Sequence, residues 1–173
     1  MEMKKFTRLS LLLALSVVLN IIESCIPLFN GYLPGLKIGL ANIVILFILY
    51  CYSFKDALYV SILRVFLVGM VRTGLFSVAF FFSLGGAILS LIAMFCAKKF
   101  TRLSIVGVSI IGSIFHSIGQ IISAIFLVNS SAIVFYLPWL LLFSIPTGIL
   151  TGMISKQMME SFKDLNEIGV SLY

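Results

Sequence analysis

Apolar runs, separated by short polar breaks, make up almost the whole chain. A helix of roughly 15–25 apolar residues, rising about 1.5 Å per residue, is long enough to cross a hydrocarbon core about 30 Å thick. Six runs are of this kind, namely 9–29, 38–52, 56–74, 75–97, 104–128 and 132–154. The pattern predicts an all-α integral membrane bundle of six helices, in a single domain over 1–156 that is followed by a polar cytoplasmic tail, 157–173.

Composition supports a membrane protein. The chain is 61% hydrophobic and 10% charged, with a mean hydropathy of +1.21. A soluble domain of this size needs more charge to cover its apolar surface. Lys4, Lys5 and Arg8 precede the first run, as in a signal peptide, but the run continues past Glu23 without a clear small-x-small cleavage motif. We expect this segment to be retained as the first helix.

The formal charge of +6 comes mostly from cations placed in the gaps between the runs. If both termini are cytoplasmic, these gap cations all fall on the cytoplasmic side, as the positive-inside rule requires. They are Lys4, Lys5, Arg8, Lys55, Lys98, Lys99, Arg102, Lys156 and Lys163. This asymmetry predicts a multi-pass protein of a bacterial cell membrane with both ends inside, and it explains the basic charge without a nucleic-acid partner.

A few ionisable residues interrupt the runs themselves. They are Glu23, Lys37, Arg64, Arg72 and His116. Such groups are costly at membrane depth and face a bundle interior or a water-filled cavity. Helical rise places Arg64 about 12 Å from the inner end of its helix, and Glu23 and Arg72 about 24 Å from the inner face. We therefore predict a polar cavity that opens outward, with Arg64 and His116 towards its floor.

The candidate substrate-binding residues combine these groups with polar and aromatic neighbours. Arginine suits bidentate binding of a carboxylate or phosphate, so we expect an anionic or zwitterionic ligand. The aromatic residues would provide stacking walls. The set is Glu23, Lys37, Asn42, Arg64, Arg72, His116, Gln120, Tyr136 and Trp139.

Several of these residues also have a purely structural interpretation. Glu23 can serve as the ion-pair partner of Arg72 or Lys37, because buried charges demand partners. A lone His116 can be an interhelical hydrogen-bonding residue, and Trp139 can belong to an interfacial aromatic belt. Two glycine motifs predict helix packing: Gly148-xxx-Gly152, by default within the monomer, and the pair Gly85-Gly86, which permits a close helix contact or a kink.

Recognisable catalytic motifs are missing from the sequence. There is no P-loop, GxSxG or HExxH motif. Asp56 and Asp164 are the only aspartates, so the chain lacks an aspartate-rich motif for magnesium on a diphosphate. We expect neither enzymatic activity nor a metal site. Asp56 is also placed to support the N-terminus of the third helix.

Four short motifs resemble those of the Gx transporter family, whose members often carry the label heptaprenyl diphosphate synthase component I. They are LPGLKIGLANIV from Leu33, DAL from Asp56 with Arg64-Val, SLGG from Ser83, and GVS from Gly107 with HSIGQ from His116. The resemblance extends from the first helix to the last. It implies a fold similar to the six-helix substrate-binding (S) components of energy-coupling factor transporters, which bind a vitamin or similar molecule near the outer face.

The resemblance also implies partners. S components borrow ATP hydrolysis from a separate energy-coupling module, which docks on small residues of the first helix; here the nearest match is Ser10-xxx-Ala14. Besides that module, we expect contact with membrane lipid and a small-molecule ligand. Some relatives resemble the membrane subunit of flavin-based extracellular electron transfer, which would make the ligand a quinone or flavin. A third alternative is an accessory subunit of prenyl diphosphate synthesis for the menaquinone side chain.

Overall fold

The computed structural model describes residues 2–25, 39–128 and 131–167, and this part of the chain is helical without any strand. Its α-helices are α1 (Glu2–Cys25), α2 (Leu40–Cys51), α3 (Phe54–Val68), α4 (Val78–Phe100), α5 (Ile105–Val128) and α6 (Leu137–Glu167). A π-turn, Gly69–Thr73, extends α3, and a 3-10 turn, Ser131–Tyr136, precedes α6. The prediction of an all-α fold is confirmed.

Not all of the six helices are long enough to cross a membrane. Four apolar stretches qualify by length and composition: Met3–Ser24, Val78–Phe100, Ile105–Val128 and Ile133–Phe162. By contrast, α2 has 12 residues and spans about 18 Å. The helix count agrees with the six apolar runs, and four of the helices in the described part of the chain meet both the length and the composition of a full span.

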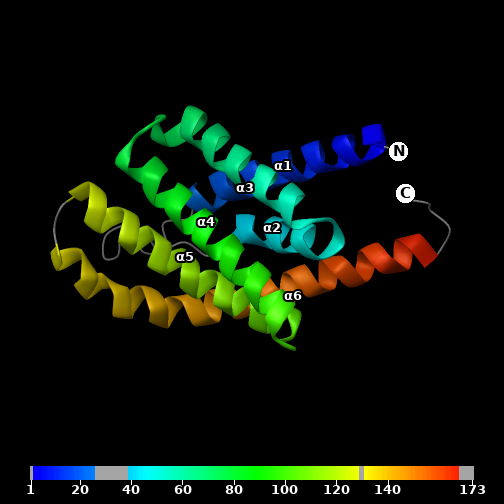
Figure 1. The fold of residues 1–173 in the computed structure, drawn as a ribbon. Coiled ribbons are helices and arrows are strands. Elements are labelled where there is room, and N and C mark those ends of the chain that lie inside the picture. Colours follow the sequence, from blue (N-terminus) through cyan, green and yellow to red (C-terminus); the bar gives the residue numbers. More distant parts are fainter. Residues whose placement is uncertain (1, 26–38, 129–130, 168–173) are drawn as a thin grey trace.

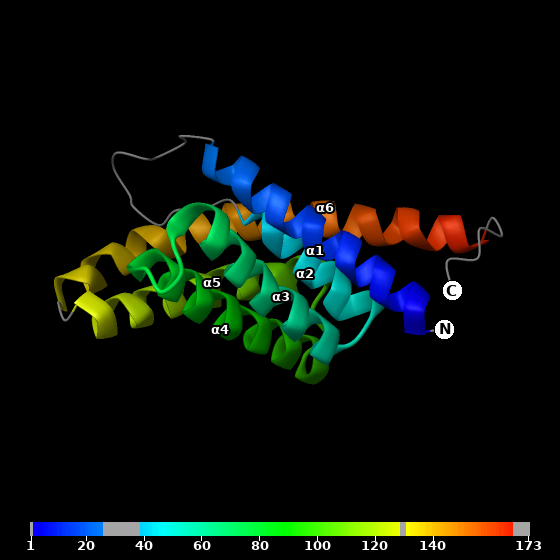
Figure 2. The same ribbon diagram turned by 90° about the horizontal axis from the view of Figure 1, so that it is seen from above.

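The short helix α2 is the core of the bundle. It contacts α1, α3, α4 and α6, and both ribbon views place it among the longer helices (Figures 1 and 2). Every residue from Ile43 to Leu49 is buried, on all sides of the helix. A helix that is apolar all round needs apolar surroundings, either protein or lipid. The neighbouring helices provide them for α2, which is too short to span a membrane, while α1 and α6 keep exposed faces.

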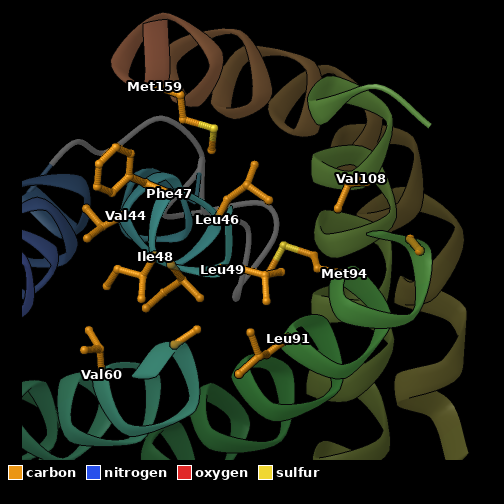
Figure 3. Close-up of a cluster of buried hydrophobic side chains, with 13 residues drawn as sticks. Val44, Leu46, Phe47, Ile48, Leu49, Val60, Leu91, Met94, Val108 and Met159 are labelled. Carbon is orange, nitrogen blue, oxygen red and sulfur yellow. The ribbon is translucent and has the colours of Figure 1, made fainter. Parts of the chain in front are cut away.

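Side chains from the surrounding helices fill the space around α2 (Figure 3). Val60 comes from α3, Leu91 and Met94 from α4, Val108 from α5 and Met159 from α6. All five side chains are at most 6% exposed. Four helices thus contribute buried side chains to this main cluster in addition to α2, and a second, smaller cluster consists of Val65, Phe80 and Ala87.

Glycines bring α4, α5 and α6 into close contact. A Cβ atom on Gly119 of α5 would lie 2.6 Å from the carbonyl oxygen of Gly85 on α4. Cβ atoms on Gly148 and Gly152 of α6 would lie 2.7 and 2.8 Å from the Cα atoms of Ile110 and Val106 on α5. Both glycine motifs thus mediate helix packing within the monomer, as the sequence predicted.

Cations gather at one end of the bundle, which we call the basic end. The Lys5 ammonium lies 2.8 Å from the Asp56 carboxylate, which joins the start of α1 to the start of α3. Asp56 and Ser53 form a capping box on α3, which confirms the expected role of Asp56. Lys98 donates to the Leu49 carbonyl at the end of α2. The cations at this end are Lys4, Lys5, Arg8, Lys55, Lys98, Lys99 and Arg102.

Helix α6 continues into the segment that we expected to be a loose tail, 157–173. It stays helical to Glu167, and the residues after that lie outside the described part. Met159 is 6% exposed, and the Phe162 ring meets the Phe47 ring of α2 edge-on, with centroids 5.3 Å apart. These two side chains anchor this part of α6 on the core, and the cytoplasmic location of 157–173 stays a prediction.

The contact between α4 and α5 yields a first prediction. Gly119→Ala places a methyl group against the backbone of Gly85 and Gly86, which cannot move aside as a flexible side chain does. We expect the free energy of unfolding to fall by about 1–3 kcal/mol. Titration with a denaturing detergent, followed by circular dichroism, measures this change.

Gly107→Ala is the matched control, because its Cβ would first meet the Leu103 side chain, at 3.3 Å. We expect it to stay within about 1 kcal/mol of the original protein, since alanine also improves helix propensity. Equal destabilisation by the two substitutions would contradict the close contact between α4 and α5.

Candidate functional site

A polar cavity of about 50 Å³ lies in the half of the bundle that is remote from the basic end. It is formed near the last turns of α1 and α3 and the first half of α6. Its lining residues are Asn20 and Glu23 of α1; Gly39, Ala41 and Asn42 at the start of α2; Arg64, Val65, Val68 and Thr73 of α3 and its π-turn; Phe80 and Ser83 of α4; Ser113, His116, Ser117 and Gln120 of α5; and Leu140, Phe143, Ser144 and Thr147 of α6.

The structure brings together most of the polar residues that the sequence singled out. Glu23, Asn42, Arg64, His116 and Gln120 all line this cavity, although they come from four different helices. Estimates of depth from helical rise were sufficient to group them, because straight helices in a bundle share one axis direction. The prediction of a shared polar cavity is therefore supported by geometry, and ligand binding in it stays a prediction.

Two candidate residues do not line the cavity. Trp139 is 56% exposed on the first turn of α6, which fits the interfacial interpretation. Arg72 is exposed, and its guanidinium donates to the Ser24 carbonyl at 3.5 Å. Lys37 and the Tyr136 side chain lie outside the described residues.

The π-turn explains why Arg72 is excluded. Arg64 and Val68 line the cavity four residues apart, so a continued α-helix would place Arg72 next on the same face. The π-turn instead follows an i→i+5 pattern. Thr73, five residues after Val68, takes the position at the cavity, and Arg72 points away.

Glu23 holds the N-terminus of α2. Its Oε1 accepts the Gly39 N–H at 2.5 Å, and its Oε2 accepts the Leu40 N–H at 3.2 Å. The first amides of a helix have no partner within the helix, and the helix dipole favours a negative charge beside them. Gly39 adopts φ +83°, a conformation that suits glycine. Glu23, which is 6% exposed, thus has a structural role at this cavity.

Arg64 is the buried cation of the cavity. It is 3% exposed, and its Nη1 donates to the Asn42 Oδ1 at 3.3 Å. Its Nε is buried and has no hydrogen-bond partner among the described residues. The Glu23 carboxylate, which lines the same cavity, interacts with this charge. A buried donor without an acceptor is destabilising, so the Nε–H favours an acceptor in the cavity.

Sequence reasoning missed the contribution of α6 and the role of small polar residues. The Ser117 hydroxyl donates to Ser144 at 2.6 Å, and the Ser144 hydroxyl donates to the Leu140 carbonyl at 2.6 Å. Ser144 and Thr147 lie on one helical face because they are three residues apart. On α5, Ser113, His116, Ser117 and Gln120 are likewise three or four residues apart and line the cavity together. Polar residues at this spacing were therefore the sequence signal that could have revealed the contribution of α6.

The expected docking residues of α1 lie on its free side. Ser10 and Ala14 are both exposed and lie one turn apart, on the same face of the helix. The Ser10 hydroxyl donates to the Phe6 carbonyl of its own helix. This face of α1 is available to lipid or to a partner protein.

The arrangement suits recognition of polar groups. One guanidinium, one carboxylate, three side-chain amides, an imidazole and several hydroxyls face a small space whose other walls include Val65, Phe80 and Phe143. Within the described residues, no three His, Cys, Asp or Glu side chains form a group suited to a metal ion. The cavity can therefore provide hydrogen bonds and one fixed positive charge to a small ligand.

The role of Glu23 leads to a second prediction. Glu23→Gln removes the charge and turns an amide N–H₂ towards one of the two backbone N–H donors of α2. We expect the free energy of unfolding to fall by about 1.5–3 kcal/mol, the usual range for hydrogen bonds to a charged group. Chemical or detergent unfolding of the purified protein measures it.

Glu160→Gln provides the control. Glu160 is exposed and lies 3.7 Å from Lys156 in an i,i+4 surface pair, which contributes about 0.5 kcal/mol or less. If both glutamate substitutions had the same small effect, the contact of Glu23 with α2 would have no stabilising role.

Comparison with known proteins places the chain in a family. No curated protein and no solved structure matches it. The profile of heptaprenyl diphosphate synthase component I matches residues 12–158, a stretch that includes every described residue lining the cavity and confirms the resemblance drawn from the motifs. The chain belongs to the heptaprenyl diphosphate synthase component I family.

Proposed function

We propose that this protein is a membrane subunit that binds a small polar or anionic molecule in the cavity beside Arg64 and does not itself catalyse a reaction. One observation carries the proposal: a guanidinium that is 3% exposed, with a buried Nε lacking a partner among the described residues, lines a cavity. Ionisable groups at membrane depth commonly mark ligand sites. The role resembles that of a substrate-binding component in a transporter.

The proposed orientation puts the cavity on the outer side of the cell membrane. The basic end carries the cations of α1, α3 and α4, and positive ends face the cytoplasm. Both termini are then cytoplasmic, because α1 begins and α6 ends at that side of the bundle (Figure 1). A ligand would enter from outside, and the exposed face of α1 around Ser10 and Ala14 would be available to an energy-coupling module.

Ligand binding is tested on the detergent-solubilised protein. Flavins, quinone precursors and prenyl diphosphates are screened by thermal shift, and bound molecules are identified by native mass spectrometry. Gln120→Ala removes a hydrogen-bonding group that is 7% exposed at the cavity, so we expect affinity for the bound molecule to fall about five- to tenfold.

Ile122→Ala changes an exposed residue of α5 and should leave affinity unchanged. Absence of any ligand in both measurements, or equal losses in the two variants, would argue against a binding function for the cavity.

A second candidate function follows from the family match. The family name refers to a component of a heptaprenyl diphosphate synthase, and this chain lacks an aspartate-rich magnesium motif. We propose as the alternative that it is an accessory subunit that supports a separate synthase subunit bearing that motif. Co-expression tests it: stable co-purification with the soluble subunit, and a change in its rate or product length, are expected. A synthase subunit that neither binds this protein nor responds to it would exclude this role.

A further inference from the structure

We infer that the group recognised in the cavity is a compact oxyanion, either a carboxylate or a phosphate monoester, and that the Arg64 guanidinium holds it. The inference rests on the proposed binding function and narrows it to one ligand chemistry. It also separates the roles of the two charged residues of the cavity, since Arg64 contacts the ligand while Glu23 positions α2.

Arg64 supplies donors in a fixed arrangement. A guanidinium carries five N–H groups in one plane and matches the two oxygens of a carboxylate or phosphate. Nη1 points to Asn42, whereas the buried Nε has no partner among the described residues. At 3% exposure this charge is shielded from bulk water. The Glu23 carboxylate of the same cavity interacts with this charge, but Nε still has no acceptor among the described residues, which an oxyanion in the cavity would provide together with further countercharge.

The surroundings disfavour a cationic ligand. A ligand ammonium needs an acidic partner, but Glu23 directs one oxygen to the Gly39 N–H and the other to the Leu40 N–H. The N-terminus of α2 adds partial positive charge beside this carboxylate. The carboxylate is thus engaged with the backbone of α2 and also interacts with the charge of Arg64, so it is a poor partner for a ligand cation.

The size of the cavity limits what fits beside Arg64. A volume of about 50 Å³ accommodates roughly three to five water molecules, at about 10–15 Å³ for each. This space holds an oxyanion and a few further atoms. A larger molecule would place only its oxyanion in the cavity and keep the remainder outside. Among the described lining residues Arg64 is the only arginine or lysine, which matches one charged group better than two.

The test measures thermal stabilisation of the protein in an uncharged detergent at constant ionic strength. The probes are acetate, inorganic phosphate and dodecyl phosphate, with methylammonium and glycerol as cationic and neutral comparisons and chloride as the reference. We expect the oxyanions to raise the melting temperature relative to chloride, and Arg64→Gln to weaken the apparent affinity about tenfold or more. Arg64→Lys keeps the charge without the planar fork and should bind with intermediate affinity.

Arg72→Gln is the matched control, because this exposed arginine lies on the π-turn that extends α3 but does not line the cavity. It should retain the response of the original protein. Equal losses in Arg64→Gln and Arg72→Gln would overturn the assignment to Arg64.

A second measurement does not depend on the folding of the Arg64 variants. In protein labelled with ¹⁵N-arginine, the Nε–H resonances come from Arg8, Arg64, Arg72 and Arg102. Substituting the other three assigns the Arg64 signal by elimination. We expect acetate or phosphate to shift this resonance selectively, with saturation, and chloride to leave it in place.

The outcomes distinguish the possible sources of the oxyanion, and they test the oxyanion assignment separately from the binding function. A response to acetate or inorganic phosphate indicates a water-soluble ligand, and a response to dodecyl phosphate alone indicates the headgroup of an amphiphile; both support the inference. Binding of only glycerol or methylammonium would overturn the oxyanion assignment and leave the binding function standing. No response to any probe, together with no ligand in the wider screen, would contradict both the oxyanion assignment and the binding function.

Discussion

Enclosure of one short apolar helix governs the rest of this structure. Seven consecutive residues of α2 are buried, and Gly39 and Leu40 at its start are half-buried beside the cavity, where their N–H groups need acceptors. Glu23 of α1 meets that requirement with both carboxylate oxygens. The polar cavity is thus a direct result of placing a helix end within an apolar core, and α1 is tied to α2 by the same contact.

Once the start of α2 lies inside the bundle, a site for polar groups follows. Asn42, in the first turn of α2, accepts a hydrogen bond from Arg64 of α3, so the two shortest helices meet at the cavity. Hydroxyl groups contribute to another wall of the cavity, where a hydrogen bond between Ser117 and Ser144 joins α5 to α6. These contacts join α1, α2 and α3 on the one hand and α5 and α6 on the other, so they help to fix the positions of five helices at the site.

Much of this arrangement could be predicted from sequence, because the apolar runs and the free-energy cost of ionisable groups at membrane depth are strong constraints. The helical runs and the convergence of Glu23, Asn42 and Arg64 followed from them, and the family followed from short motifs. The partner of Glu23 did not, since no pattern announces which backbone amides a carboxylate will meet. The position of Arg72 required knowledge of a local change in helical register, and the length of α6 depended on tertiary contacts of Phe162 with the core.

The π-turn also determines how many positive charges the cavity contains. It adds one residue to the last turn of α3, and that single residue separates a cavity with one arginine from a cavity with two. In a relative that kept these residues in a regular α-helix, Arg72 would come four residues after Val68 on the face of Arg64, and the paired guanidinium groups would suit a doubly charged group such as a diphosphate. Charge selectivity in this fold can thus change through the local geometry of one helical turn, with every side chain conserved.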